Sequence, residues 1–346
     1  FLYFIEISKF DCKTMKVLVC GGAGYIGSHL VRELVRETDW SVVVVDSLVA
    51  THGQTLQVEK AAQVEVGDVR DSVFLNHVFE KHRPDAVVHM CAWLVVPESV
   101  RDPLAYYDNN VVGTLRVLEA MKRFNCDKII FSSTAALFGT PQRTPIEPDD
   151  RKAPESPYGD TKFACEMMIR ACEAAYGIRS VCLRYFNACG AHIDGDIGET
   201  HDPETHLIPL VLQVALGQRS HINILGTDYA TPDGTCVRDY VHVTDLATAH
   251  IQSLKYLNKG GRSDAFNLGL DNGFSVREVI QACRKVTGHA IPAVEGGRRE
   301  GDPPILVASS LRAREVLGWS PKFTTIDQII ETAWRFHSSH PNGYKN

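Results

Sequence analysis

The stretch Lys16–Leu30, KVLVCGGAGYIGSHL, determines the fold class of this chain. A short apolar run with β-branched residues leads into Gly21, Gly24 and Gly27, and a helical pattern starts at Ser28. The glycines allow a tight turn, a close approach of the backbone to a diphosphate, and close packing of helix on strand. The free N–H groups that open a helix can then bind the phosphates. The stretch therefore predicts a strand–loop–helix unit that binds a dinucleotide.

Beyond this unit, apolar strand-like runs alternate with helical segments. The expected strands are 16–22, 41–47, 63–68, 85–90, 128–133 and 180–187, and the expected helices include 28–37, 73–82, 112–124 and 158–177. Apolar strands in strict alternation with helices are typical of a parallel sheet that is covered on both faces. We expect an α/β fold with a Rossmann-type, doubly wound sheet.

The character of the chain changes after Asn187, where segments rich in proline, glycine and aspartate appear. They predict the loops of a smaller C-terminal α/β domain that binds the substrate. The expected divisions are an N-terminal extension (1–14), a dinucleotide-binding domain (15–190, with 238–270 returning to it) and a substrate domain (191–237 and 271–346). The extension lacks the pattern of a signal peptide, because charged residues interrupt its apolar start.

Composition excludes several function classes. The 346 residues are 44% hydrophobic and 23% charged, as in an ordinary globular enzyme, and the net charge of -6 argues against general binding of nucleic acid. No apolar run approaches the roughly 18 residues of a membrane-spanning helix. The ten cysteines form no C-x-x-C pair and the 14 histidines no H-E-x-x-H pattern. We therefore expect no metal site, and reduced thiols in a cytoplasmic protein.

Two aspartates at predicted strand ends extend the dinucleotide site. Asp46 closes the second strand, 19 residues after Gly27, where a carboxylate can accept hydrogen bonds from ribose hydroxyls and repel a 2′-phosphate. This favours NAD over NADP. Asp68 and Val69 follow the third strand, where they could bracket an adenine ring. The alternative for both aspartates is a purely local role in shaping a turn.

Tyr158 and Lys162 are the strongest candidates for chemistry. Their spacing of four residues places them on one face of a helix, and a nearby ammonium group favours the phenolate of a tyrosine. A lowered phenol pKa would make Tyr158 a usable base. A surface pair would show the same spacing, but Thr134 ends a strand at the edge where open α/β sheets bind ligands. This position favours a catalytic trio.

These motifs together resemble the extended short-chain dehydrogenase/reductases. They are Gly-x-x-Gly-x-x-Gly, Ser132-Ser133-Thr134, Ser156-Pro-Tyr158-x-x-x-Lys162 and Arg184-Tyr-Phe-Asn187. Within that group, the runs ESVRDPLAYYDNNVVGTLRVLEAM, RYFNACGAH, GDIGE, GTDYATPDGTCVRDYVHV, RREGDPP and HPNGY are similar to those of the UDP-glucose 4-epimerase family. The resemblance extends from Met15 to Tyr344.

The resemblance implies a reaction and a set of contacts. A tightly held NAD takes hydride from C4 of UDP-glucose or UDP-galactose and returns it to the opposite face of a 4-keto intermediate. Tyr158 would act as base and acid, Thr134 would hydrogen-bond the reacting oxygen, and Lys162 would bind the nicotinamide ribose and tune Tyr158. The implied cofactor contacts are Gly21, Gly24, Tyr25, Ile26, Gly27, Asp46, Asp68, Val69, Met90, Cys91, Asn110, Ser132, Tyr158, Lys162 and Tyr185. The implied substrate contacts are Thr134, Tyr158, Asn187, His206, Leu207, Arg238, Arg299, Asp302 and Leu306.

The chain departs from the family pattern at Leu94, His206 and Thr134. Leu94 stands where a lysine commonly contacts the cofactor, which predicts weaker retention of NAD unless another group compensates. His206 lies in Thr-His-Leu instead of Asn-Asn-Leu, and Thr134 replaces a serine while keeping the hydroxyl. Leu306 occupies the position that gates the substituent at C2 of the sugar. Its intermediate size predicts a preference for UDP-glucose and UDP-galactose over their N-acetyl forms.

Several alternatives share the fold. A sugar-nucleotide 4,6-dehydratase would carry an acid pair after the threonine, whereas Thr134 is followed by two alanines. Epimerases of UDP-pentoses or UDP-glucuronate differ only in pocket shape and stay open, as does a dehydrogenase that releases NADH. A binding module without activity would be expected to have lost Tyr158 or Lys162. Apolar stripes on two expected helices (112–124 and 163–177) predict a homodimer, although such stripes could also only cover the sheet.

Overall fold

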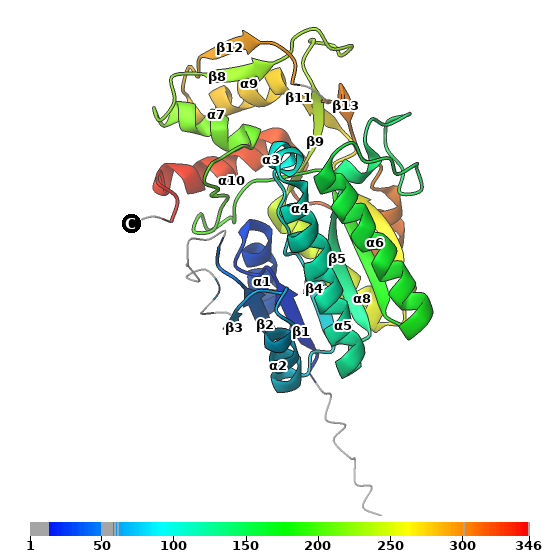
Figure 1. The fold of residues 1–346 in the computed structure, drawn as a ribbon. Helices are drawn as coiled ribbons and strands as arrows, with labels where there is room; N and C mark the ends of the chain where they lie inside the picture. Colours follow the sequence, from blue (N-terminus) through cyan, green and yellow to red (C-terminus); the bar gives the residue numbers. More distant parts are fainter. Residues whose placement is uncertain (1–13, 50–57, 59, 61, 300–301, 345–346) are drawn as a thin grey trace, which may run out of the picture.

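The computed structural model describes residues 14–344, apart from 50–57, 59, 61 and 300–301, so all of the expected extension except Thr14 lies outside the described residues. The larger part is a seven-stranded parallel sheet in the order β10-β6-β5-β4-β1-β2-β3 (Figure 1). Its strands are β1 (Lys16–Cys20), β2 (Ser41–Asp46), β3 (Gln63–Val66), β4 (Ala86–His89), β5 (Lys128–Thr134), β6 (Arg179–Tyr185) and β10 (Asp264–Leu268). This confirms the Rossmann-type fold and all six expected strands. The edge strand β10 was not predicted.

Strand β2 shows why this sequence forms a central layer. Val42 and Val44 belong to one hydrophobic core, and Val43 and Val45 belong to the core on the opposite face. Because successive side chains of a strand point to opposite faces, an uninterrupted valine run fits only a sheet that is covered on both sides.

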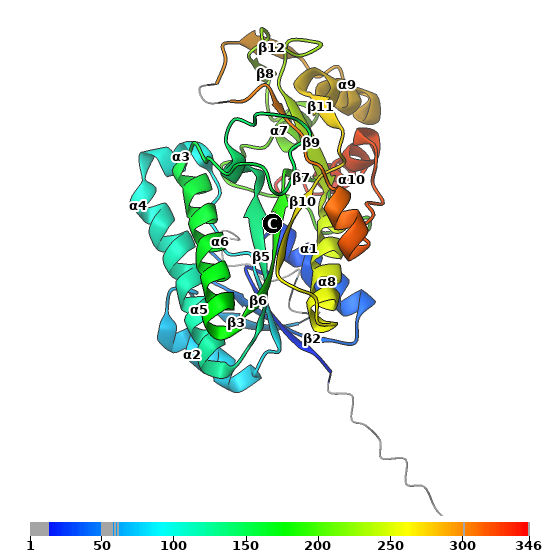
Figure 2. The ribbon, with the colours of Figure 1, turned by 90° about the vertical axis from the view of Figure 1, so that its right-hand side faces the viewer.

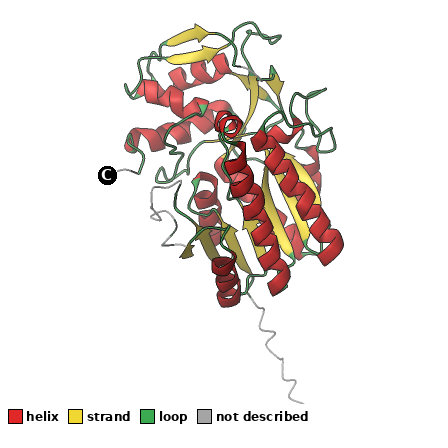
Figure 3. Cartoon of the chain, in the orientation of Figure 1, coloured by secondary structure: helices red, strands yellow, loops and turns green. Residues whose placement is uncertain are grey.

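Helices cover both faces of this sheet, as Figures 2 and 3 show. One face packs against α1 (Tyr25–Glu37) and α8 (Val243–Asn258), and the other against α2 (Ser72–His82), α5 (Gly113–Phe124) and α6 (Pro157–Tyr176). The segment before α5 forms α3 (Val96–Arg101), α4 (Pro103–Tyr106) and the π-helical turn η1 (Tyr107–Val112). The short helices η2 (Ala135–Phe138) and η3 (Ala313–Leu317) complete the large part. No helix in the described ranges is both long enough and apolar enough to cross a membrane.

A smaller part lies beyond the carboxyl ends of the strands, at the top of Figure 1. It contains a four-stranded sheet of β7 (Asn187–Cys189), β9 (Val237–His242), β11 (Gly273–Ser275) and β13 (Ile305–Leu306), and a pair of β8 (Ile222–Leu225) and β12 (Ala293–Gly296). Helices α7 (Leu207–Ala215), α9 (Val276–Thr287) and α10 (Ile326–Ser339) enclose a separate core. Of the segment 238–270, α8 and β10 pack in the large part, whereas β9 belongs to the small sheet. The domain boundaries themselves stay a prediction.

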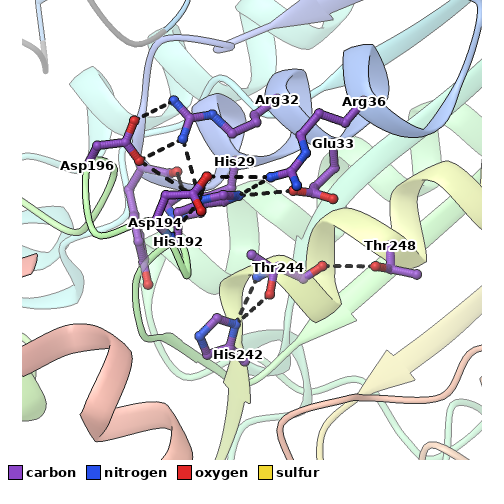
Figure 4. Close-up of polar contacts among 11 residues, drawn as sticks. His29, Arg32, Glu33, Arg36, His192, Asp194, Asp196, His242, Thr244 and Thr248 are labelled. Atoms are coloured by element: carbon purple, nitrogen blue, oxygen red, sulfur yellow. Dashed lines mark hydrogen bonds and ion pairs between the residues drawn. The ribbon is translucent and has the colours of Figure 1, made fainter. Parts of the chain in front are cut away.

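A polar network joins the two parts (Figure 4). From α1, Arg32 forms a two-pronged ion pair with Asp196 at 2.7 and 2.8 Å. The buried ring of His192 lies among Arg32, Arg36 and Glu33, at 3.2 to 3.4 Å. The helix that follows the glycine loop is thereby fastened to the segment after β7.

Candidate active site

The glycine loop has the geometry that binding of a diphosphate needs. Gly21 has φ +87°, and a Cβ atom on Gly27 would lie 2.0 Å from the carbonyl oxygen of Gly21. Gly24 caps α1 without any side-chain hydrogen bond, so the N–H groups of the first turn remain open to an anion. Tyr25 and Ile26 form the first residues of that turn. Tyr25 donates its hydroxyl to the carbonyl oxygen of Gly190, 2.7 Å away.

Asp46 has a local role and spare hydrogen-bonding capacity. Its carboxylate accepts from the backbone of Ala23 at 3.0 Å and of Leu48 at 2.8 Å, and burial raises its pKa. The turn-shaping alternative is therefore correct for these two bonds. Each oxygen keeps a second lone pair that can accept a hydrogen bond from a ribose hydroxyl.

Residues that follow β3 and β4 line the same edge of the sheet as the glycine loop. Asp68 forms a forked ion pair with Arg70, which lowers the pKa of the carboxyl group, and Val69 is buried beneath Gly113. Met90 and Cys91 follow β4. A Cβ atom on Gly21 would lie 2.9 Å from the backbone nitrogen of Cys91, so this segment lies directly against the glycine loop.

Asn110 is a buried residue whose side-chain amide is hydrogen-bonded to other parts of the protein. It is 1% exposed in the π-helical turn, donates to the carbonyl oxygen of Trp93 and to the hydroxyl of Thr161, and accepts from Trp93 and Asn109. These four bonds use both donors and both lone pairs of its amide. A direct contact between Asn110 and the cofactor would need one of them to break. Leu94, the residue after Trp93, is 41% exposed.

The trio lies where α6 meets the ends of β5 and β6. Ser156 caps α6 through the backbone N–H of Gly159, and Pro157 occupies the first turn, so Tyr158 enters the helix at the sheet edge. Lys162, one turn later, is 3% exposed, with its Nζ 4.5 Å from the ring centre of Phe131. Within the described ranges no hydrogen bond or ion pair satisfies this ammonium group, and burial lowers its pKa.

The electrostatics of Tyr158 differ from the expectation. Burial raises the pKa of the phenol, and a hydrogen bond with Thr134 only partly opposes the rise. Lys162 is not among the groups that set this pKa. In the protein alone, therefore, the net shift is upward, because desolvation of the phenolate outweighs its one polar partner.

Tyr185 and Ser132 complete this part of the edge. Tyr185 pairs with Thr134 in the register of β5 and β6, and burial raises its pKa while a hydrogen bond with Ser132 opposes the rise. Behind them, buried Arg184 and Glu166 form two hydrogen bonds of 2.9 and 2.6 Å. Sequence reasoning missed Glu166. Its position one turn after Lys162 on α6 was the available signal.

The candidate substrate groups gather on β9, β13 and the loop before β13. Asp302 forms ion pairs with Arg238 and, at 3.1 Å, with the exposed Arg299. Leu306 pairs with Arg238 in the register of β13 and β9, and it packs against the cluster of Leu137 and Phe138 that follows Thr134. This contact joins the substrate strands to the catalytic edge.

Asn187 and His206 come from the segments on either side of the loop that follows β7. Asn187 opens β7 opposite Tyr240 of β9. His206 caps α7 ahead of Leu207, with its Nδ1 2.9 Å from both Glu199 and Glu204. Burial opposes protonation, but the two carboxylates outweigh it and raise the pKa of His206 to about 10. Neither glutamate was singled out from the sequence.

Comparisons with known proteins identify the family of this chain. Residues 17–269 match the model of the NAD dependent epimerase/dehydratase family. A UDP-glucose 4-epimerase from Lacticaseibacillus casei is 52% identical over 95% of this chain and 99% of its own length. A crystal structure of a UDP-glucose 4-epimerase is 51% identical, with a TM-score of 0.93 over 96% of this chain and all of that one.

A second similar structure was solved with its cofactor bound. The UDP-glucose 4-epimerase from Brucella ovis, solved in complex with NAD, is 44% identical, with a TM-score of 0.90 over 93% of this chain and 98% of that one. The strand-end site, the family match and the near full-length identity lead to one conclusion. This chain belongs to the NAD-dependent epimerase/dehydratase family and, within it, to the UDP-glucose 4-epimerases.

Proposed function

We propose that this chain interconverts UDP-glucose and UDP-galactose by inverting the configuration at C4, with bound NAD as a transient hydride acceptor. One observation carries the proposal. Thr134, Tyr158 and Lys162 lie at the sheet edge between the glycine loop and the substrate strands, and Leu306 packs on the segment that follows Thr134. A group held at Arg238 and a group held at Gly24 would therefore meet at this trio.

The residues of the edge fit NAD. Gly21 and Gly27 leave no room for Cβ atoms against the protein's own backbone, as expected for the tight turn and the close helix–strand packing of a dinucleotide-binding loop. Asp46 has lone pairs for ribose hydroxyls and would repel a 2′-phosphate. Lys162 is a buried cation that forms no hydrogen bond or ion pair in the described ranges, which suits the nicotinamide ribose. The cofactor, when bound, supplies a hydride acceptor and a positive charge.

Tyr158 is positioned to move the proton of the 4-hydroxyl. As phenolate it would take that proton, and as phenol it would return the proton once the configuration is inverted. Because burial raises its pKa, the phenolate needs added positive charge. Thr134, which already bonds the phenol, would hydrogen-bond the reacting oxygen. Behind the trio, Ala135 and Ala136 lack the acid and base that elimination of water would need.

The substrate groups suit a nucleoside diphosphate. Arg238 and Arg299 can bind a diphosphate, with Asp302 between them for the hydroxyls of a ribose. Asn187, His206 and Leu207 would form the wall from the other side. Leu306 is half-buried beside Arg238 and would limit the space at C2 of the sugar. This supports unmodified hexoses as substrates.

The test is an NMR time course of the purified protein with UDP-galactose and no added NAD. Growth of UDP-glucose to a fixed ratio would support the proposal and show that NAD is carried along. Conversion only after NAD is added would keep the function and assign weak retention to Leu94, with Leu94→Lys as the restoring variant. No conversion even with NAD, from a folded protein, would overturn the proposal. Net NADH that accumulates would instead indicate a dehydrogenase.

We also propose a homodimer that is formed through the helices from α3 to α6. This surface carries exposed apolar side chains that a monomer would leave in water: Val96, Val100, Leu104, Tyr107, Leu115 and Met167. These helices lie together on one side of the molecule (Figure 2). Sedimentation should give a dimer at micromolar concentration and a shift towards monomer for Leu104→Asp. A wild-type monomer would contradict the proposal.

A cytoplasmic location is the final proposal. The nine cysteines in the described ranges are free thiols, as expected in a reducing compartment. Fractionation of the source cells tests it.

A further inference from the structure

Four side chains converge in the segment between β7 and α7. Glu199, His201, Glu204 and His206 follow the pattern Glu-x-His-x-x-Glu-x-His, and one ligating atom of each lies within 4.8 Å of the others. Glu199 is 4% exposed, and the other three side chains are partly buried. We refer to these four residues as the Glu–His quartet.

The histidine–carboxylate distances within the quartet lie within about 0.5 Å of the edges of a tetrahedron around a metal ion, with the two histidines against different oxygens of Glu204. His206 Nδ1 lies 2.9 Å from an oxygen of Glu199 and 2.9 Å from one of Glu204. His201 Nδ1 lies 3.3 Å and 3.6 Å from oxygens of the same two residues. A tetrahedral ion with bonds of about 2.0–2.1 Å has ligand–ligand edges of about 3.3–3.4 Å. Small movements would bring all four atoms to such an ion.

A second observation also indicates a missing partner. Nδ1 of His201 is shielded from solvent and forms no hydrogen bond of acceptable geometry in the described structure, although it faces two carboxylates. Between two carboxylates this nitrogen holds either a proton, which burial opposes but the carboxylates favour by raising the pKa of His201 to about 9, or a metal ion that displaces the proton. Two imidazoles and two carboxylates are a donor set that suits zinc and similar divalent transition metals.

A second cluster of ligand-type side chains in the same molecule differs from the quartet in its charge partners. His192, Asp194 and Asp196 also converge (Figure 4), but Arg32 pairs with Asp196 and Arg36 with Asp194. Those guanidinium groups supply the positive charge, and both aspartates are exposed. No lysine or arginine forms an ion pair with the quartet within the described ranges.

We propose that the Glu–His quartet binds one divalent transition-metal ion of the zinc class. The ion would take Nδ1 from each histidine and one oxygen from each glutamate. The ion would connect the segment 199–206 to the start of α7. Within that segment, the ring of His201 packs edge-on against Tyr25, the first residue of α1. Nε2 of His206 would remain available for substrate. The proposal depends on the quartet alone and does not rest on the proposed reaction.

The test is a titration of chelator-treated full-length protein with Co²⁺ and Zn²⁺ near pH ~8, because binding must displace protons from the imidazoles. We expect one ion per chain and the visible absorption of tetrahedral Co²⁺, which Zn²⁺ abolishes by displacement. His201→Gln and Glu204→Gln should each weaken binding at least about 100-fold, since loss of a ligand costs more than loss of a group that only orients one. His77→Gln, a change at an exposed histidine on α2, should bind as the wild type does.

Two results would overturn the proposal. One is the absence of stoichiometric uptake of Co²⁺ or Zn²⁺ by the folded wild-type protein. The other is uptake that His201→Gln and Glu204→Gln leave unchanged, which would place the ion elsewhere. Thermal unfolding of each variant without metal checks that it is folded. A metal-dependent rise in Tm in wild type and His77→Gln, but not in the quartet variants, would support the site independently of the absorption.

Discussion

The two ends of the active site handle charge in opposite ways. At the catalytic edge, Lys162 is buried over an aromatic ring and forms no hydrogen bond or ion pair among the described residues, and Tyr158 has one polar partner. At the substrate end, Arg238 and Arg299 each already form an ion pair with Asp302. The first end keeps reactive groups short of partners, whereas the second keeps its charges paired until a ligand can exchange with them.

This difference predicts different consequences for substitutions. Changes at the catalytic edge should alter the rate of the chemical step, because its groups interact most with the reacting atoms. Changes at the substrate end should alter KM, because those groups bind parts of the ligand that do not react.

Tyr158→Phe should give the largest effect. Removal of the proton-transfer group should lower kcat about 10²–10⁴-fold and leave KM nearly unchanged. Steady-state kinetics with UDP-galactose measures both values. Tyr176→Phe, at the exposed end of the same helix, is the control and should behave as wild type. A Tyr158→Phe enzyme with near-normal kcat would remove Tyr158 from the chemistry.

Glu166→Ala tests the support behind the catalytic edge. The change leaves the guanidinium group of Arg184 buried and unpaired, at a cost of about 3–5 kcal/mol in the free energy of unfolding. Denaturant unfolding measures it. Glu119→Ala, which breaks the exposed pair with Arg116, should cost less than about 1 kcal/mol. Equal losses in the two variants would show that the buried pair has no special role.

Arg238→Gln should separate the two ends of the site. Loss of a charged hydrogen-bond donor to the diphosphate is worth about 1.5–3 kcal/mol, so KM should rise about 10–100-fold while kcat changes little. The matched control is Arg298→Gln, which removes an exposed charge one residue before Arg299. If the control raises KM equally, general electrostatic attraction and not position is responsible.

Leu306→Ala should change selectivity more than speed. Removing the half-buried side chain makes room at C2 of the sugar, and steric changes of this size are worth about 1–3 kcal/mol. The ratio of kcat/KM for UDP-N-acetylgalactosamine to that for UDP-galactose should rise about tenfold. Leu311→Ala, at an exposed leucine, should leave the ratio unchanged. Wild-type enzyme that already turns over both substrates equally would refute the gate.

Thr134→Val should slow the chemical step, and it should also shift the pH dependence of that step in a clear direction. The hydrogen bond from Thr134 lowers the pKa of Tyr158 against the effect of burial. Its loss should raise that pKa, so the acidic limb of the kcat/KM profile should move to higher pH, because the phenolate forms only above its pKa. Thr134→Ser should restore the wild-type profile. A limb that stays in place would mean that another group sets it.

Most of the large sheet could be predicted because its signals are local. The valine run of β2 specifies a strand with two buried faces, and Gly21 and Gly27 occupy loop positions with no room for a side chain. The edge strand β10 was missed because it is short and follows the segments assigned to the substrate domain, so only its pairing with β6 places it in the large sheet.

The sequence by itself determined the fold class, the glycine loop and the placement of Tyr158, Thr134 and Lys162 at one edge. Parallel strands bring their carboxyl ends together whatever the details of packing. Only the tertiary structure showed that Asn110 uses all of its side-chain hydrogen-bonding capacity within the protein. It also showed that Leu306 packs beside Phe138 and that the four residues of the Glu–His quartet converge. The physical reason is that these contacts join residues that are distant in the chain or lie in an irregular loop. No periodic pattern of residues in the sequence predicts these contacts.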